Sequence, residues 1–222
     1  MTNRSSIEFL DVAAHDLRTW VTIIYGGVNL LKSRFQEMDE ENRLLLIGDI
    51  EGASEKLRQA VEGMLLLARL EAGRAPAAAP LHLHDVVSQV AAAFSGLRPS
   101  RRLHTEIEET GPVVAVRAHV EYVLRTLLVD MDQVAATEAV IDVRAGGRSA
   151  REATISVLAP AEQKPQAEFL ALEYGGGGEG SHGRHLAPLV VRRLLEDQSG
   201  SMTARLTPED AIEVSFTVPL AG

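Results

Sequence analysis

The chain of 222 residues contains no cysteine, which excludes disulfide bonds and thiolate metal sites. Aromatic residues make up only 4% of it, so we expect aliphatic side chains to dominate the packing of its helices. No apolar run reaches the roughly 18 residues of a membrane-spanning helix, and the N-terminus lacks the apolar core of a signal peptide. These absences predict a cytoplasmic protein with no membrane partner.

Positive charge is also scarce, because 22 Lys and Arg residues stand against 31 Asp and Glu, for a net charge of −9. This balance argues against a nucleic-acid partner, whose phosphates require a basic surface. With 45% hydrophobic and 24% charged residues, the composition is that of a globular chain. The length allows one large domain or two small ones.

The first third of the chain carries two heptad patterns, which are typical of helices packed side by side. We expect one helix from about residue 5 to 35 and a second that ends near residue 72, joined by a short polar turn at residues 38–42. The first pattern comprises Leu10, Ala14, Leu17, Val21, Ile24, Val28, Leu31 and Phe35. The second comprises Ile47, Ile50, Ser54, Leu57, Val61, Met64, Ala68 and Glu71.

Two such helices predict an antiparallel hairpin. Leu44, Leu65 and Leu66 widen its apolar face beyond one seam, and a second copy of the chain would bury that surplus. We therefore assign residues 1–75 to an all-α dimerisation domain that forms a four-helix bundle in a homodimer. The alternative, a bundle within one chain, is disfavoured because no further heptad helix follows.

Residues 73–80 end the second helix and are typical of a linker, and a second domain is expected over residues 81–222. Helical and alternating strand patterns follow one another there. The expected helices are 84–94, 118–135 and 186–197; the expected strands are 103–107, 113–116, 139–144, 154–158, 201–206 and 212–218. Residues 163–174 are expected to form a short lid. This order predicts an α/β sandwich with the helices on one face of a sheet.

One motif on the first helix suggests chemistry. A single His on a helix is ordinarily a solvated residue, but Phe9-Leu10 is followed after four residues by His15-Asp16-Leu17-Arg18-Thr19. This pattern resembles the phospho-acceptor box of sensor histidine kinases. The resemblance implies that His15 accepts phosphate on a ring nitrogen and that Asp16 orients the other nitrogen. By the same resemblance, Thr19 is the polar residue of the box that lies one helical turn after His15. Trp20 stands where that family usually has proline, so the customary kink is not expected.

The second domain resembles the ATP-binding domain of the same family, which is of the gyrase–Hsp90 type. The resemblance rests on the order of its elements and on its ending, a helix that begins at Leu186 and a hairpin that ends Phe216-Thr217-Val218-Pro219-Leu220. It therefore covers nearly the whole chain.

The nucleotide motifs of that family are altered in this sequence. Active members have two Asn on one helix, and one of these binds Mg²⁺. This sequence has Thr126 and Asp130 at the two positions, and Asp130 could still hold a metal. At the position where active members have an Asp that accepts a hydrogen bond from the adenine amino group, we align Leu158, and no glycine follows it. A glycine-rich stretch keeps Gly178, Gly180 and Gly183 as remnants of a phosphate loop, although glycine runs are also common in solvated loops.

The intact acceptor box and the altered nucleotide motifs favour a histidine phosphotransferase of a phosphorelay, related in character to dimeric members with a degenerate second domain. Such a protein exchanges phosphate with response-regulator receiver domains, which supply their own Mg²⁺, and an upstream histidine kinase is a further expected partner. We expect weak or absent ATP binding and no metal or cofactor of its own. Arg18 is a candidate contact for an acidic receiver. Two alternatives remain open: a divergent but active sensor histidine kinase, and a non-catalytic dimeric scaffold.

Overall fold

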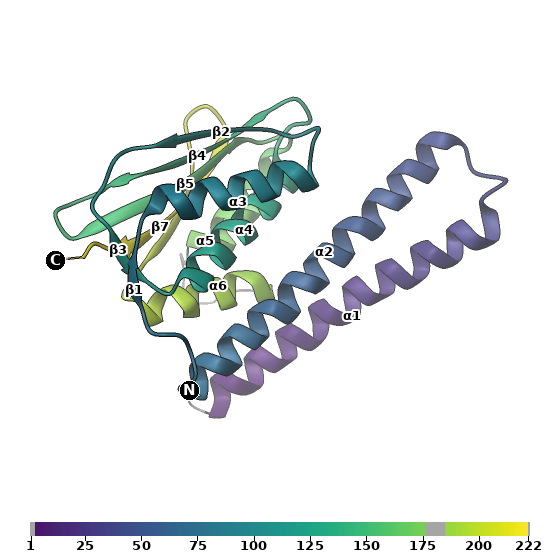
Figure 1. The fold of residues 1–222 in the computed structure, drawn as a ribbon. Helices are drawn as coiled ribbons and strands as arrows, with labels where there is room; N and C mark the ends of the chain where they lie inside the picture. Colours follow the sequence, from purple (N-terminus) through teal and green to yellow (C-terminus); the bar gives the residue numbers. More distant parts are fainter. Residues whose placement is uncertain (1–2, 176–184, 222) are drawn as a thin grey trace. The chain divides into compact units, whose positions relative to one another are not determined.

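The computed structural model describes residues 3–175 and 185–221. It divides into two compact units, Met1–Leu65 with His185–Ala187, and Leu66–Arg184 with Pro188–Gly222. Figure 1 shows a long helical hairpin for the first and an α/β fold for the second. Both architectures agree with the fold class expected from the sequence.

The hairpin consists of α1 (Asn3–Arg34) and α2 (Glu40–Glu71). Asp39 ends the turn between them, where its Oδ1 accepts a hydrogen bond of 2.8 Å from the backbone N–H of Asn42. Such a bond satisfies an amide that the first turn of a helix would leave unpaired. Lys32 and Arg34 lie in the last turn of α1, where positive charge is favourable at the carboxyl end of a helix. The local sequence therefore defines both sides of the turn.

The seam between the two helices differs from the expected one. On α1 the buried and half-buried positions that follow a heptad are Phe9, Ala13, Leu17, Trp20, Ile24, Gly27 and Leu31. Only Leu17, Ile24 and Leu31 belong to the expected seam, whereas Leu10, Val21, Val28 and Phe35 are exposed. The expected pattern thus merged two neighbouring stripes, one that faces α2 and one that lies open.

The second unit is built on a five-stranded sheet in the order β2-β4-β5-β7-β6. The strands are β2 (Arg102–Ile107), β4 (Val140–Gly147), β5 (Glu152–Pro160), β6 (Met202–Leu206) and β7 (Ala211–Pro219). β2 pairs with β4 in parallel, and every other neighbouring pair in this sheet is antiparallel. A separate two-stranded sheet joins β1 (Ala79–Leu81) to β3 (Val113–Ala115).

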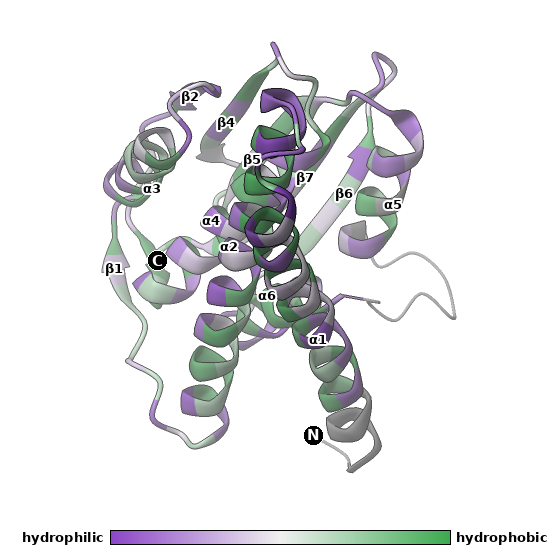
Figure 2. Ribbon diagram, turned by 90° about the vertical axis from the view of Figure 1, so that its right-hand side faces the viewer, coloured by the Kyte–Doolittle hydropathy of each residue, from purple (hydrophilic) through white to green (hydrophobic). Residues whose placement is uncertain are grey.

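The helices of this unit are α3 (Leu83–Leu97), α4 (Arg117–Val134), α5 (Lys164–Gly175) and, from Pro188 on, α6 (Leu186–Asp197). They gather on one face of the sheet, as Figures 1 and 2 show. β5 illustrates the consequence, because Ile155 and Val157 are fully buried while Thr154 and Ser156 are half-exposed. The core therefore lies between the helices and one face of the sheet, as a period of two predicts.

Two elements differ from expectation. Ala79–Leu81 is expected to be linker and the beginning of the second domain, but it forms a strand because it pairs with β3. Residues 163–174 are expected to form a lid, but α5 occupies nearly all of them. The buried and half-buried residues Ala167, Leu170, Ala171 and Tyr174 of α5 recur at spacings of three and four. A helical signal is therefore present in the sequence at this point.

Candidate functional site

His15 lies on α1 with its side chain 73% exposed. Its Nδ1 is 3.4 Å from Oδ1 of Asp16, a long contact that nevertheless directs this side of the ring toward the carboxylate. The Thr19 hydroxyl, one turn further on, donates 3.0 Å to the backbone oxygen of His15. Arg18 is exposed, and its position three residues after His15 puts it on the same side of the helix. The expected acceptor group is thus open to solvent, and Nε2 lies on the side of the ring away from Asp16.

Asp16 has a side chain only 3% exposed. Residues 185–187 belong to the same unit, and the backbone N–H of Leu186 donates 2.8 Å to Asp16 Oδ2. His185 Nδ1 lies 3.4 Å from Oδ1. Burial by itself would raise the pKa of Asp16, but the hydrogen bonds from His185 and Leu186 outweigh it and lower the pKa. Asp16 is therefore a carboxylate near neutral pH.

These two partners of Asp16 were missed by sequence reasoning. They lie about 170 residues further along the chain, and no local pattern connects residues so distant. The acidic residue after the acceptor histidine was the only part of this arrangement that the sequence could show.

The chain offers a matched comparison on α3, where His84 is also followed by an acid, Asp85. The His84 side chain is 74% exposed and its Nδ1 is 3.8 Å from Asp85 Oδ1. Asp85, however, is 65% exposed, whereas Asp16 is enclosed. What distinguishes the His15 pair is thus the enclosure of its acid and the hydrogen bonds from His185 and Leu186 that hold it, not the presence of an acid.

In the second unit, Thr126 and Asp130 lie one turn apart on α4. The Tyr174 hydroxyl at the end of α5 donates a hydrogen bond of 2.5 Å to Asp130 Oδ2. Burial, followed by the nearby negative charge of Asp130, raises the pKa of Tyr174 well above its usual value, so the phenol stays protonated. Thr126 is fully buried, and its hydroxyl has no hydrogen-bond partner among the described residues. Sequence reasoning named Asp130 but missed Tyr174.

The end of β5 is the place where the resemblance implies an adenine acceptor. The alternation along β5 leaves Leu158 half-exposed and puts Ala159, which is fully buried, on the face that carries the core. An adenine acceptor that pointed into the interior would therefore have to be the side chain at position 159, one residue after the position expected from the sequence. Neither residue has a side-chain oxygen, so the absence of an acceptor holds at both positions.

Gly178, Gly180 and Gly183 lie outside the described residues. Among residues 3–175 and 185–221, no group of three or more His, Asp and Glu side chains could hold a metal ion. With no side-chain acceptor at the end of β5, the described residues do not fit an adenine nucleotide held in the way that the resemblance implies. Helices long and apolar enough to cross a bilayer are likewise not found in the described part of the chain.

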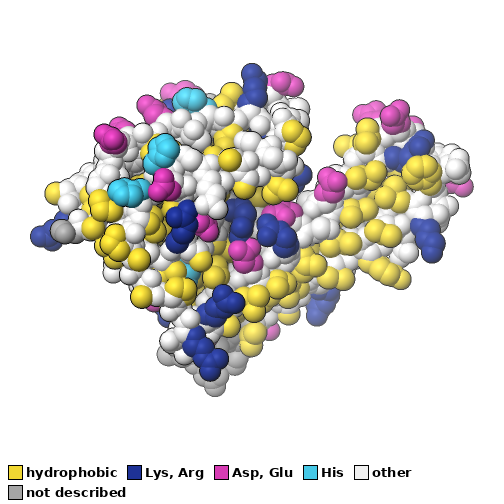
Figure 3. Space-filling model, in the orientation of Figure 1, with side chains coloured by type: hydrophobic (Ala, Val, Ile, Leu, Met, Phe, Trp, Pro, Cys, Tyr) yellow, Lys and Arg dark blue, Asp and Glu magenta, His cyan; other side chains and the backbone are white. Residues whose placement is uncertain are grey.

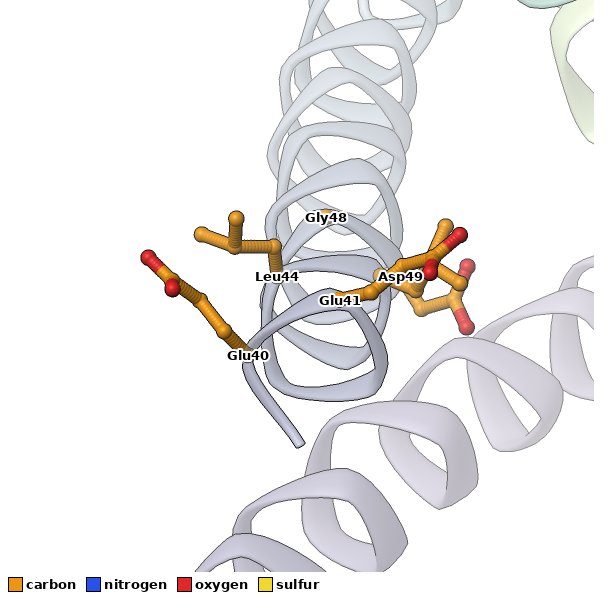
Figure 4. Close-up of a pocket in the computed structure, with 6 residues that line it drawn as sticks. Glu40, Glu41, Leu44, Gly48 and Asp49 are labelled. Atoms are coloured by element: carbon orange, nitrogen blue, oxygen red, sulfur yellow. The ribbon is translucent and has the colours of Figure 1, made fainter. Parts of the chain in front are cut away.

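The hairpin has an exposed apolar stripe, defined here as Leu10, Val21 and Val28 on α1, Phe35 just after α1, and Ile47, Val61 and Leu65 on α2. Figure 3 shows hydrophobic side chains along the hairpin. An open groove at the beginning of α2 is lined by Glu40, Glu41, Leu44, Leu45, Gly48 and Asp49. Figure 4 shows these side chains and labels each of them except Leu45. Leu44 and Leu45 are each 62% exposed, so this end of the hairpin is apolar with an acidic border.

Comparisons with known proteins bear on both units. Residues 5–73 match the family model of the His Kinase A (phospho-acceptor) domain, a segment that contains His15. No curated protein matches the chain.

Solved structures match over almost the full length. The histidine kinase AdeS of Acinetobacter baumannii has a TM-score of 0.62 at 17% identity, over 94% of this chain and 98% of that one. A histidine kinase from Burkholderia phymatum STM815 has a TM-score of 0.53 at 15% identity, over 100% of both chains. Full-length ShkA in complex with AMPPNP has a TM-score of 0.56 at 15% identity, over 97% of this chain and 46% of that one.

These identities are too low to carry an activity, but the folds agree. The phospho-acceptor match supports histidine phosphorylation within residues 5–73, and the solved structures show a common fold. Residues 5–73 therefore match a His Kinase A phospho-acceptor domain, and the chain has the fold of histidine kinases.

Proposed function

We propose that this chain carries a phosphoryl group on His15 and exchanges it with response-regulator receiver domains as a phosphorelay phosphotransferase. The observation that carries the proposal is the setting of His15: an exposed ring whose Nδ1 side faces the buried, charged Asp16. The match of residues 5–73 to a phospho-acceptor domain supports the same residue.

The chemistry follows from this geometry. Nε2 of the neutral imidazole attacks the phosphorus of a receiver's aspartyl phosphate, the bond from phosphorus to the acyl oxygen breaks, and the aspartate leaves as a carboxylate. A nitrogen–phosphorus bond forms at Nε2, and the ring becomes positively charged unless it loses the proton on Nδ1. Asp16 stabilises that charge and can accept the proton. Transfer to another receiver reverses these bonds.

The end of β5 supports a receiver rather than ATP as the source of phosphate. Leu158 and Ala159 provide no side-chain acceptor where adenine would need one. Loss of the partner of one buried polar group typically costs about 1–3 kcal/mol, or about one to two decades in affinity. On this proposal the protein needs no nucleotide and no metal of its own, and receivers supply Mg²⁺.

The second candidate is an ATP-dependent histidine kinase, and the comparisons favour it over the first. Two of the named solved structures are histidine kinases, and ShkA is in complex with AMPPNP. Asp130 would then hold the metal with the carboxylate that also accepts a hydrogen bond from Tyr174. A dimeric scaffold with an idle His15 is the third candidate, and no observation favours it.

The test is radiolabelling of the purified chain. One sample receives ATP labelled on its γ-phosphate with Mg²⁺, and others receive receiver domains of the source organism, each carrying labelled phosphate on its aspartate. We expect label from at least one receiver and none from ATP, in an acid-labile and base-stable linkage. Labelling by ATP alone would replace the first candidate by the kinase, and no labelling at all would favour the scaffold.

A matched pair of variants assigns the site. His15→Gln should abolish labelling, whereas His84→Gln should leave it unchanged. His84 is the matched control because its side chain is equally exposed and also precedes an acid. Both side chains are exposed, so circular dichroism should show the same helix content in both variants. Full labelling of His15→Gln would place the acceptor elsewhere.

A further inference from the structure

The carboxylate of Asp16 lies between two histidine rings. Its Oδ1 is 3.4 Å from Nδ1 of His15 and also 3.4 Å from Nδ1 of His185. Its Oδ2 accepts a hydrogen bond of 2.8 Å from the backbone N–H of Leu186. Residues 185–187 belong to the same compact unit as α1. One oxygen of the acid therefore faces both rings, and the other is held by the backbone.

The acid and the two rings differ in their exposure. The side chains of His15 and His185 are 73% and 47% exposed, whereas that of Asp16 is 3% exposed. A buried carboxylate depends on its hydrogen-bond donors, because bulk water does not reach it to take their place. The orientation of Asp16 is thus set by the protein groups around it.

These groups hold Asp16 at both of its oxygens. A single hydrogen bond at Oδ2 would still let a carboxylate pivot about the held oxygen. The ring of His185 adds a contact at Oδ1, and two contacts on different oxygens fix the plane of the group, so Oδ1 stays beside His15. A carboxylate at Nδ1 favours the histidine tautomer with its proton on that nitrogen. The lone pair of Nε2 is then available to attack phosphorus.

We propose that His185 is a positioning residue for phosphoryl transfer at His15, because its ring holds Oδ1 of Asp16 beside Nδ1 of the acceptor. This inference rests on the proposed function, which it deepens by naming a residue outside the acceptor motif that prepares the acceptor histidine. His185 lies 169 residues after Asp16 in the sequence, so it acts on the acceptor through the fold and not through the motif.

The experiment reads the tautomer of His15 by nitrogen-15 NMR of the imidazole rings. The sample is the full chain with labelled histidine, without receiver or nucleotide. At about pH 8 a histidine with the ordinary pKa of about 6.5 is neutral, and its two ring nitrogens differ in chemical shift according to which one carries the proton. Signals that disappear in His15→Gln belong to His15. We expect the tautomer with the proton on Nδ1 to dominate in the wild type.

Two variants of His185 test the contact. His185→Ala should lower the ratio of the Nδ1–H to the Nε2–H tautomer of His15 about two- to tenfold, the usual effect of one hydrogen-bond partner, and should slow receiver-dependent labelling by a similar factor. His185 has a further interaction in the structure, so alanine does not isolate the contact with Asp16. His185→Asn does, because its amide nitrogen is as many bonds from the backbone as Nδ1 and can donate to Oδ1. We expect His185→Asn to keep most of the wild-type ratio and rate.

His84→Ala is the matched control. The His84 side chain is 74% exposed and its Nδ1 is 3.8 Å from an acid, Asp85, so the change removes a similar ring elsewhere in the chain. It should leave the tautomer of His15 unchanged, and circular dichroism should show the same helix content in all variants. Equal tautomer ratios in the wild type and His185→Ala, or a loss in His185→Ala that is just as large in His185→Asn, would overturn the proposal.

The wild type alone keeps the test decisive if His185→Ala does not fold. Its His15 ring should carry the proton on Nδ1, whereas the His84 ring, beside an acid that is 65% exposed, should show less of this tautomer. The same ratio for both rings would overturn the proposal. The NMR measurements involve no receiver. They can therefore fail while receiver-dependent labelling of His15 succeeds, and an absence of labelling would leave the tautomer result standing.

Discussion

Gly27 of α1 lies so close to Ile50 of α2 that a methyl group on Gly27 would come within 2.7 Å of Ile50 Cγ1. The glycine thus sets how near the two helices approach at this level. A methyl group on the neighbouring Gly26 would meet nothing within 4 Å. The two glycines offer a direct test of the hairpin packing.

We expect Gly27→Ala to lower the free energy of unfolding by about 1–2 kcal/mol. Overpacking of a tight contact typically costs about 1–3 kcal/mol, and the better helix propensity of alanine returns up to about 1 kcal/mol of it. Gly26→Ala should gain about 0.5–1 kcal/mol, since only propensity changes there. Urea unfolding followed by circular dichroism checks both values, and a stabilised Gly27→Ala would show that the helices are further apart than described.

The exposed apolar stripe supports our proposal of a homodimer. Val28→Glu together with Ile47→Glu would bury two charges in a four-helix bundle, which is costly without partners. We expect this double variant to be monomeric by light scattering. Asn29→Glu, an exposed change on another side of α1, should keep the mass of the wild type. A dimeric double variant would show that the stripe is not the dimer interface.

His119 predicts a pH dependence of stability. It is 1% exposed in α4, and burial lowers its pKa below the ordinary 6.5, with a smaller opposing effect of Asp197. The unfolded chain therefore binds this proton more readily than the folded one. The stability that the neutral His119 provides is present above pH 6.5 and is lost as the pH falls through that value toward the folded pKa.

The measurement is the urea midpoint at pH 7.5 and at pH 5.5. We expect His119→Leu to show a smaller loss between the two values than the wild type, because leucine does not titrate. His84→Leu should keep the wild-type loss, since His84 is exposed. An equal pH dependence in His119→Leu would assign the effect to other groups.

Asp16→Asn tests the role of the acid beside the acceptor. The amide keeps an oxygen for the Leu186 N–H but carries no charge to stabilise the phosphorylated ring. We expect receiver-dependent labelling of His15 to slow about ten- to hundredfold, as for outer partners that orient a functional histidine. Asp85→Asn is the matched control and should leave the rate unchanged. An unaffected rate in Asp16→Asn would mean that Asp16 only supports the structure.

Much of the fold follows from local pattern. Heptad spacing predicts the two hairpin helices to within a few residues, and alternation predicts the strands of the main sheet. The helix at Leu186–Asp197 is expected at its observed ends. Periodicity reports which elements form, because burial of one face of a helix or strand depends on residues close in sequence. Periodicity did not separate the positions of α1 that face α2, which include Gly27, from the exposed apolar stripe, which includes Val28. Both sets follow a heptad, and they differ by one position.

The sequence by itself determined the acceptor motif around His15 and the lack of an adenine acceptor near Leu158. Only the tertiary structure decided what Asp16 and Asp130 do. Asp16 is held and kept charged by residues about 170 positions away, and Asp130 is bound by a tyrosine 44 positions away. A carboxylate's chemistry depends on its burial and on the donors around it, and those donors are brought together by packing across the whole chain rather than by any spacing along it.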